Sequence, residues 1–227
     1  MANVWNVKSA RVVEDCGFKA MATSSGAIAD SLGYKDGEQI PFDELCYIVK
    51  RIKAGTHIPL SVDLERGYTD DLASLQDHIQ KLIDIGVVGI NIEDAQGEDI
   101  YLRKLNSIKS YLHKTSQQLF INARTDVFLQ KLPNPLETTL DRAARYQQAG
   151  ADGLFVTGIN DTDLIAKIVA ATTLPVNVSG PKLSISALTA CGVKRVSMAV
   201  FLYNASYKHM ARMAEEILSG QSFAPLF

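Results

Sequence analysis

Three carboxylic acids stand where two apolar segments of the chain end, and their spacing suggests metal chemistry. The segments are Leu60–Tyr68 and Val88–Asp94, about one strand-and-helix unit apart. An apolar run that closes on Asp63, Glu65 or Glu93 predicts a buried parallel strand with acids at its carboxyl end, where α/β folds bind ligands. Acids gathered there repel one another unless a proton or a cation neutralises them. Oxygen ligands suit a hard divalent ion, so the pattern predicts a Mg²⁺ or Mn²⁺ site.

The acids also have plainer interpretations. Asp63 and Glu65 are two residues apart, so an extended strand points them the same way. Both could instead cap the next helix or pair with Arg66, although Asp63 lies deeper in the apolar segment. Glu93 and Asp94 alternate faces, so we expect only one of them to face the site. We expect Asp94 to cap or brace a neighbouring loop.

Arg124 closes a third apolar segment, Phe120–Asp126. A guanidinium at the end of an apolar strand has no structural role unless it faces an anion. It could neutralise the acids, or it could clamp a carboxylate or phosphonate of a substrate, which its planar fork suits. We expect Asp126 to orient a neighbour rather than to contact substrate.

Two further groups of polar residues stand beside apolar segments. Ser24, Ser25 and Gly26 form a small-residue turn whose hydroxyl and N–H groups could bind a carboxylate or oxyanion. Such turns are common, so this one does not decide between a ligand and a simple turn. Asn177 interrupts the apolar segment Pro175–Val178, where it could bind substrate or satisfy buried backbone groups.

Short β-branched segments alternate with amphipathic ones along the whole chain. The predicted strands are Ala2–Trp5, Ala20–Thr23, Ile58–Asp63, Val87–Glu93, Leu119–Arg124, Gly153–Val156, Pro175–Val178 and Arg195–Met198. The predicted helices are Ser9–Cys16, Phe42–Ala54, Leu72–Ile85, Tyr101–Leu112, Leu136–Ala149, Thr162–Ala171, Ser184–Ala190 and Phe201–Leu218. Eight such units without a break in composition predict a (β/α)₈ barrel, one domain over residues 1–227, rather than a doubly wound sheet. The long segment Ser24–Pro41 is expected to be an irregular, functional loop.

The composition narrows the function classes. The chain has 227 residues, 47% of them hydrophobic and 21% charged, which suits a globular protein with a large core. A formal net charge of −2 gives no support for binding nucleic acid or an anionic membrane surface. No apolar stretch is long enough to span a bilayer. Three widely spaced cysteines, Cys16, Cys46 and Cys191, suggest reduced thiols in a cytoplasmic protein.

Missing residue types exclude several mechanisms. The four histidines fall at predicted strand starts or on predicted helices, so a histidine base is not expected. No lysine ends a predicted strand, which argues against a Schiff-base aldolase. The chain has no Gly-Lys-Ser/Thr and no Gly-x-Gly-x-x-Gly motif, so nucleotide cofactors have no support.

Several segments in order resemble one known family. They are Asn3–Arg11, Ala22–Gly37, Val62–Tyr68, Gly89–Asp94, Ile121–Asp126, Ala149–Phe155 and Pro175–Val178. Together they resemble the isocitrate lyase/phosphoenolpyruvate mutase superfamily, and most of all its short phosphoenolpyruvate mutase-like members. The resemblance implies a (β/α)₈ barrel, Mg²⁺, and cleavage or formation of a C–C or P–C bond beside a 2-oxo acid.

The resemblance also implies a role for the acids and an oligomeric state. It implies that Asp63, Glu65 and Glu93 hold Mg²⁺ largely through water, with Asp36 behind them. Family members often form tetramers that exchange the last helix, so Phe201–Leu218 is expected to be shared between subunits of a dimer or tetramer.

Further assignments concern the substrate. By the same resemblance, Ser24, Ser25 and Gly26 bind the carboxylate of a pyruvate-like fragment. Arg124 contacts its oxygens or the leaving group, and Asn177 lines the pocket.

The chain departs from the family pattern in the loop after the second acidic segment. The lyases carry a catalytic cysteine there in a Lys-Lys/Arg-Cys-Gly-His motif, whereas Asp94–Tyr101 has no cysteine and is too short for that lid. The lysine and asparagine of the mutase version are also absent. Asn6 stands where Asp is usual, and Glu65 where the lyases commonly have Asp. The group that handles protons is therefore not identified.

These observations favour a Mg²⁺-dependent lyase that cleaves a C–C bond of a small 2-hydroxy or 2-oxo dicarboxylic acid. A cation on the 2-oxo group would stabilise the pyruvate-type enolate formed as the bond breaks. One alternative is a P–C bond enzyme, either a phosphonopyruvate hydrolase or a mutase acting on a phosphonate. Another is a barrel that binds a 2-oxo acid without turning it over.

Overall fold

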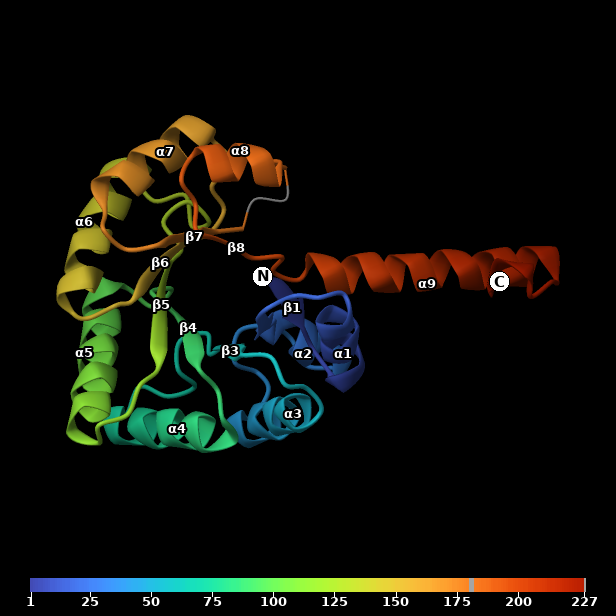
Figure 1. The fold of residues 1–227 in the computed structure, drawn as a ribbon, viewed down its shortest axis with the longest axis horizontal. Coiled ribbons are helices and arrows are strands. Elements are labelled where there is room, and N and C mark those ends of the chain that lie inside the picture. The colour runs from blue at the N-terminus through green and yellow to red at the C-terminus, as the bar shows by residue number, and fades with distance from the viewer. Residues whose placement is uncertain (180–181, 227) are drawn as a thin grey trace.

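Eight parallel strands form one sheet in which neighbours in sequence are also neighbours in space (Figure 1). The computed structural model describes residues 1–179 and 182–226. The strands are β1 (Ala2–Val4), β2 (Met21–Thr23), β3 (Leu60–Asp63), β4 (Gly89–Glu93), β5 (Phe120–Thr125), β6 (Gly153–Val156), β7 (Val176–Val178) and β8 (Arg195–Val196). All eight lie at the predicted places, and the fold is the expected (β/α)₈ barrel.

The two end strands meet and close the ring. The backbone nitrogen of Met1 donates to Val196 O at 2.6 Å. Asn3 Oδ1 accepts hydrogen bonds from Ser197 Oγ at 3.1 Å and from Met198 N at 2.9 Å. Asn3 thus joins β1 to the end of β8 at the carboxyl ends of the strands.

Helices connect the strands and cover the outside of the ring (Figure 1). They are α1 (Val7–Asp15), α2 (Ser25–Ser31), α3 (Phe42–Ala54), α4 (Leu72–Ile85), α5 (Glu98–Lys114), α6 (Pro135–Gln148), α7 (Thr162–Ala171), α8 (Ile185–Ala190) and α9 (Phe201–Gly220), followed by the 3₁₀ turn η1 (Ala224–Leu226). Helix α4 illustrates the local rules. Asp71 caps its first turn, Gly86 ends it with φ of +91°, and Leu75, Ile79 and Leu82 are fully buried.

Helix α2 lies where an irregular loop was predicted, so that part of the prediction was wrong. Ser24 caps the helix by accepting from Ala27 N at 3.4 Å. Ala27 and Ile28 are completely buried, and this packing stabilises a helix of only seven residues. The remainder of the segment, from residue 32 to residue 41, is irregular as expected.

Asn6, which differs from the family pattern, has a structural role. Its side chain caps α1 by accepting from Ser9 N at 2.8 Å, and Ser9 Oγ accepts in return from Asn6 N at 3.1 Å. Asn and Asp cap helices about equally well. The departure at this position therefore leaves α1 intact, two residues earlier than predicted.

The inward face of the strands is polar. Asn91 on β4 and Asn122 on β5 are aligned in register, and Asn122 Nδ2 donates to Asn91 Oδ1 at 2.7 Å. Their neighbours Ile90 and Ile121 belong to the apolar core between the strands and the outer helices. Most (β/α)₈ barrels fill this interior with branched apolar residues. Here polar side chains line two cavities, one at each end of the strands.

Helix α9 projects away from the ring (Figure 1). Tyr203 is its one buried residue in the described structure, and it packs edge-on against Trp5 with ring centroids 5.2 Å apart. Met210 and Leu218 are exposed. Among the described residues, no helix is both long enough and apolar enough to cross a membrane.

Candidate active site

A cavity of about 410 Å³ opens at the carboxyl ends of the strands. Six of the residues that the sequence singled out line it: Ser24, Ser25, Gly26, Asp36, Asp63 and Arg124. They come from the ends of β2, β3 and β5, from the first turn of α2 and from the loop after it. The structure thus brings together residues that are up to 100 positions apart in the chain.

Asp63 is held at the end of β3 by residues of β2 and of the first turn of α2. Ser25 Oγ donates to Asp63 Oδ2 at 2.8 Å, and the Asp63 backbone N–H donates to Thr23 Oγ1 at 2.9 Å. The other carboxylate oxygen, Oδ1, is buried and has no hydrogen-bond partner among the described residues. A buried, unpartnered carboxylate oxygen is a suitable direct ligand for a cation.

Glu65 follows β3 in a left-handed backbone conformation, with φ of +49°. Its side chain is 3% exposed and accepts from Tyr68 Oη at 2.9 Å. Burial, aided by the negative charge of Asp63, raises the pKa of Glu65 to about 7. No cationic side chain among the described residues forms a salt bridge with Glu65 to offset the effect of burial.

Glu38 braces this loop, and the sequence analysis missed it. Its Oε1 accepts from Arg66 N at 2.9 Å and from Tyr68 N at 2.7 Å, and its Oε2 lies 3.0 Å from Arg66 Nη2. Such bonds hold residues 65 to 68 in their strained, left-handed turn. The only sequence signal was the position of Glu38 in the long segment already expected to be functional.

Arg124 joins two acids at the ends of β4 and β5. Its Nη1 lies 2.7 Å from Glu93 Oε2, while its Nε and Nη2 donate to Asp126 Oδ1 and Oδ2 at 2.7 and 2.9 Å. Burial raises the pKa of Glu93 to about 8 although Arg124 acts in the opposite direction. Of the two roles predicted for Arg124, the structure shows the neutralising one. These contacts use three of its five N–H donors, and Arg124 also lines the cavity.

Asp94 supports this arrangement from behind, as the sequence suggested. Its Oδ1 accepts from Asp126 N at 2.9 Å, and its Oδ2 accepts from Arg142 Nη1 and Tyr146 Oη, each at 2.6 Å. Glu93, by contrast, points toward Arg124. The two adjacent acids therefore have different partners: Glu93 pairs with the cavity-lining Arg124, and Asp94 bonds residues behind it.

The acids are arranged for a hydrated divalent ion rather than for one enclosed by protein ligands alone. Within the described part of the chain, no three His, Cys, Asp or Glu side chains are close enough to enclose an ion directly. A Mg²⁺ ion, however, usually keeps several waters and needs only one or two carboxylates. Asp63 supplies one free oxygen, and burial together with the negative charge of Asp63 raises the pKa values of Glu65 and Glu93. The residues fit an ion beside the free Asp63 oxygen, near Glu65 and Glu93, which interact electrostatically with Asp63 although they do not line the cavity.

Gly26 allows Asp36 to approach the first turn of α2. A methyl group at Gly26 would lie 3.1 Å from Asp36 Oδ2, which is closer than a comfortable contact. Both residues line the cavity beside Ser24 and Ser25. The absence of a side chain at position 26 therefore keeps room for Asp36 and for a ligand carboxylate.

Asn177 does not join this group. It lies on β7 with its side chain in the cavity at the opposite, amino end of the strands. The active-site cavity is lined instead by residues that the sequence did not single out, including Phe155, Thr157, Asn160 and Ser197. None of these residues is part of a distinctive sequence motif, so their place in the cavity lining is seen only in the folded structure.

The site was compared with known proteins. The family model described as phosphoenolpyruvate phosphomutase matches residues 1–218. An uncharacterized protein of Mycobacterium tuberculosis is 32% identical over 223 residues, which is 97% of this chain and 85% of that protein. Oxaloacetate decarboxylase of Rhodopseudomonas palustris is 32% identical over 211 residues, covering 88% of this chain and 72% of the relative.

A solved structure extends these similarities to three dimensions. The crystal structure of a candidate phosphonomutase from Burkholderia cenocepacia superposes with a TM-score of 0.90 at 35% identity. The match covers 94% of this chain and 92% of the other. The elements that form the cavity thus have counterparts in a solved relative of nearly equal length.

Proposed function

Because this chain belongs to the phosphoenolpyruvate phosphomutase family, in the superfamily of phosphoenolpyruvate mutases and isocitrate lyases, we propose that it is a C–C lyase that decarboxylates a 2-oxo dicarboxylic acid of the oxaloacetate type. The observation that carries this proposal is the chemistry of the cavity wall. Among the described residues that line it, the only ionisable side chains are Asp36, Asp63 and Arg124. Histidine, lysine and cysteine are missing from that lining.

This wall suits decarboxylation better than cleavage of a 2-hydroxy acid. Cleaving a 2-hydroxy acid requires a base that removes the hydroxyl proton as the C–C bond breaks. Decarboxylation requires no such base, because CO₂ leaves and the bonding electrons pass to the enolate of the 2-oxo acid. The remaining proton can come from water. The short loop after β4, which has no catalytic cysteine, is compatible with that simpler reaction.

The residues of the cavity have separate tasks in this proposal. The first turn of α2, at Ser24 to Gly26, binds the carboxylate next to the 2-oxo group. The free N–H groups of Arg124 orient the departing carboxylate. Asp63, with Glu65 and Glu93 through water, would hold Mg²⁺ or Mn²⁺, which supplies Lewis-acid stabilisation of the charge developing on the 2-oxo oxygen.

A P–C bond reaction is the second candidate, and it is supported by the similarity to the candidate phosphonomutase. A phosphonate could take the place of the departing carboxylate at Arg124, because a guanidinium binds both anions in the same way. The two candidates therefore differ in the group released and not in the enolate that remains.

Product analysis separates the candidates. The protein is incubated with Mn²⁺ and either oxaloacetate or phosphonopyruvate, and pyruvate, CO₂ and inorganic phosphate are measured against the metal alone and against Asp63→Asn. Pyruvate and CO₂ from oxaloacetate above both controls support the decarboxylase. Phosphate release supports the P–C enzyme instead. No turnover, together with oxalate-dependent stabilisation, would identify a non-catalytic binder.

The proposal also includes a cytoplasmic, homo-oligomeric protein in which residues 1–227 act as one domain. Cys16, Cys46 and Cys191 are free thiols, in line with a reducing compartment. The exposed apolar side chains of α9, including Met210 and Leu218, support a dimer or tetramer in which this helix packs against another subunit. Light scattering of Met210→Asp, which should release monomers, tests the assembly.

A further inference from the structure

A second cavity, of about 640 Å³, lies at the amino ends of the strands. It is separated from the candidate active site by the hydrogen-bonded pair Asn122 and Asn91, of which Asn122 lines this cavity and Asn91 lines the other. The proposed reaction uses none of its residues. Its volume is within the range of pockets that hold small organic ligands.

Polar atoms without partners converge on this cavity. Asn177 is 1% exposed, and neither its Nδ2 nor its Oδ1 has a hydrogen-bond partner in the described structure. Ser61 Oγ and Arg195 Nε are also buried without a hydrogen-bond partner among the described residues, and both residues line the cavity. Buried polar atoms rarely remain unpaired, so these four point to a polar partner inside the cavity.

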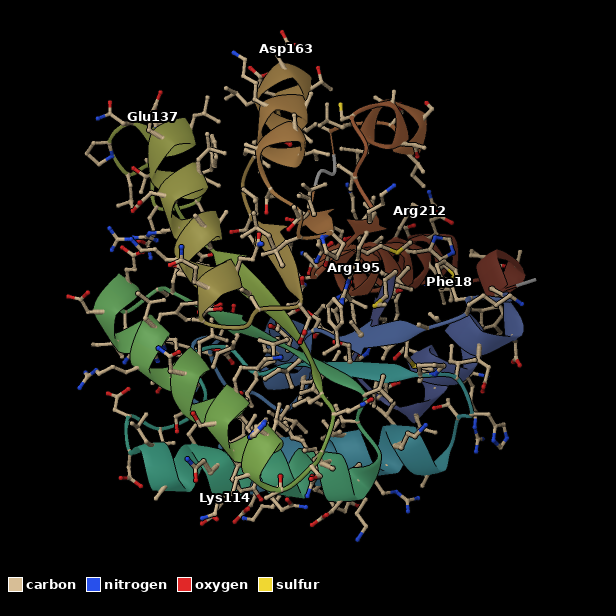
Figure 2. The ribbon with its side chains drawn as sticks, turned by 60° about the vertical axis from the view of Figure 1, so that its left-hand side comes forward. Phe18, Lys114, Glu137, Asp163, Arg195 and Arg212 are labelled. Carbon is tan, nitrogen blue, oxygen red and sulfur yellow. The ribbon has the colours of Figure 1, made fainter. Side chains whose placement is uncertain are left out.

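The cavity also carries an uncompensated positive charge. Arg195 makes no ion pair with any described residue, and no aspartate or glutamate is among the residues that line the cavity. Burial lowers the pKa of Arg195, while Asp63 acts in the opposite direction. Figure 2 shows Arg195 among the strands in the middle of the molecule, whereas Lys114, Glu137 and Asp163 lie at its periphery.

The remaining wall is mainly apolar. Met21, Phe120 and Val193 contribute to it, and Ile185 adds a side chain that is 70% exposed. A mainly apolar wall beside the half-buried Arg195 guanidinium, with Met1 and Lys194 also in the lining, favours a ligand with an apolar body and a negatively charged group.

We infer that this cavity is a second ligand site, which binds a small monocarboxylate with an apolar tail. The carboxylate accepts hydrogen bonds from Arg195 and from Asn177 Nδ2, and the tail lies against Met21 and Phe120. A guanidinium and a carboxylate form charge-assisted bonds that are stronger than those to water or to a neutral group. The inference does not depend on the reaction proposed for the other cavity.

Calorimetric titration with hexanoate tests the site, with hexanol as the neutral analogue. The titration is repeated with Mg²⁺ and oxalate at saturating concentrations to occupy the active-site cavity. We expect hexanoate to bind one site per chain, at least tenfold more tightly than hexanol, whether oxalate is present or not. Equal binding of hexanol, or loss of hexanoate binding with oxalate, would overturn the inference.

Two pairs of variants locate the binding. Arg195→Gln should weaken hexanoate at least tenfold, whereas Arg51→Gln, which removes an exposed arginine on α3, should not. Ile185→Glu places a negative charge beside the cavity at an exposed position, and it should weaken hexanoate several-fold relative to Ile185→Gln. Because Ile185 is exposed, this pair gives a result even if Arg195→Gln does not fold. Equal affinity within both pairs would contradict the site.

Discussion

The Arg124 guanidinium lies 2.7 Å from the Glu93 carboxylate, so the protein's own cation already faces one of the predicted metal-binding acids. The same guanidinium forms two bonds with Asp126, whose Oδ1 also accepts from Thr157 Oγ1 at 2.5 Å. Arg124 is therefore the centre of a network that crosses from β4 to the end of β6. A single guanidinium thus contacts two buried acids and also lines the cavity.

Replacing Arg124 with methionine should destabilise the protein and remove activity. Glu93 and Asp126 would then be buried without a counter-charge, which typically costs about 3–5 kcal/mol. Lysine keeps the charge but cannot bond both carboxylates at once, so Arg124→Lys should lose less stability and still lose at least tenfold in kcat. Urea unfolding and steady-state kinetics measure the two effects. A fully active Arg124→Lys would contradict a role for the planar fork.

Asp63→Asn should abolish metal binding with little loss of stability. The asparagine Oδ1 can still accept from Ser25 Oγ, but the carboxylate charge offered to the cation is gone. We expect Mn²⁺ affinity, followed by electron paramagnetic resonance, to fall about 100-fold, whereas Tyr68→Phe, which removes only the bond to Glu65, should change it little. Unchanged Mn²⁺ affinity in Asp63→Asn would place the ion elsewhere.

Oxalate provides a separate test of the complete site. It resembles the enolate of pyruvate, so it should bind to the cation and to the first turn of α2 together. Thermal unfolding should show a rise in Tm with Mg²⁺ and oxalate that exceeds the sum of the separate effects, because each ligand binds the folded state more tightly beside the other. Asp63→Asn should lose the excess. No shift with any divalent ion would refute the metal site.

The strands and most of the site could be predicted from the sequence because each depends on local patterns. Asp63, Glu65 and Arg124 all stand where an apolar run ends, and that position alone places them at the carboxyl end of a barrel. Helix α2 was missed because its stability comes from tertiary burial of Ala27 and Ile28 rather than from its own propensity.

Other features required the fold. Glu38 reaches its partners Arg66 and Tyr68 from 28 and 30 positions away, across two elements. Asn177 looked equivalent to the other inward-facing polar residues, but it is in register with Arg195 of β8 and lines the cavity at the amino end. Periodicity predicts which face of the sheet a strand residue occupies. It does not predict how far along the barrel axis that residue lies.

Gly26→Ala should weaken substrate binding without unfolding the protein. The added methyl group would lie 3.1 Å from Asp36 Oδ2, so either Asp36 or the first turn of α2 must shift by a few tenths of an ångström. We expect KM to rise about tenfold, which corresponds to about 1.4 kcal/mol, with Tm nearly unchanged. Gly220→Ala, where an added methyl group meets nothing within 4 Å, is the matched control. A normal KM in Gly26→Ala would show that this turn does not touch substrate.

The metal-free protein should lose stability as the pH rises through neutrality. Burial raises the pKa of Glu65 to about 7 and that of Glu93 to about 8, from 4.5 in the unfolded chain. Between pH 4.5 and these values the folded state binds more protons than the unfolded state, so the free energy of unfolding falls with increasing pH. The contribution of these two groups is complete below pH 4.5 and is lost above about pH 8.

Urea unfolding in EDTA at pH 5.5, 7.0 and 8.5 measures this slope. Mg²⁺ should restore stability mainly at pH 8.5, because the ion binds the deprotonated carboxylates and takes over the neutralising role of the protons. Glu65→Gln with Glu93→Gln should flatten the slope in EDTA and make the response to Mg²⁺ nearly independent of pH, because an amide has no proton to lose in this range. If the double variant keeps the full slope, other groups cause the pH dependence of the free energy of unfolding. Glu65 and Glu93 would then not have raised pKa values in the folded protein.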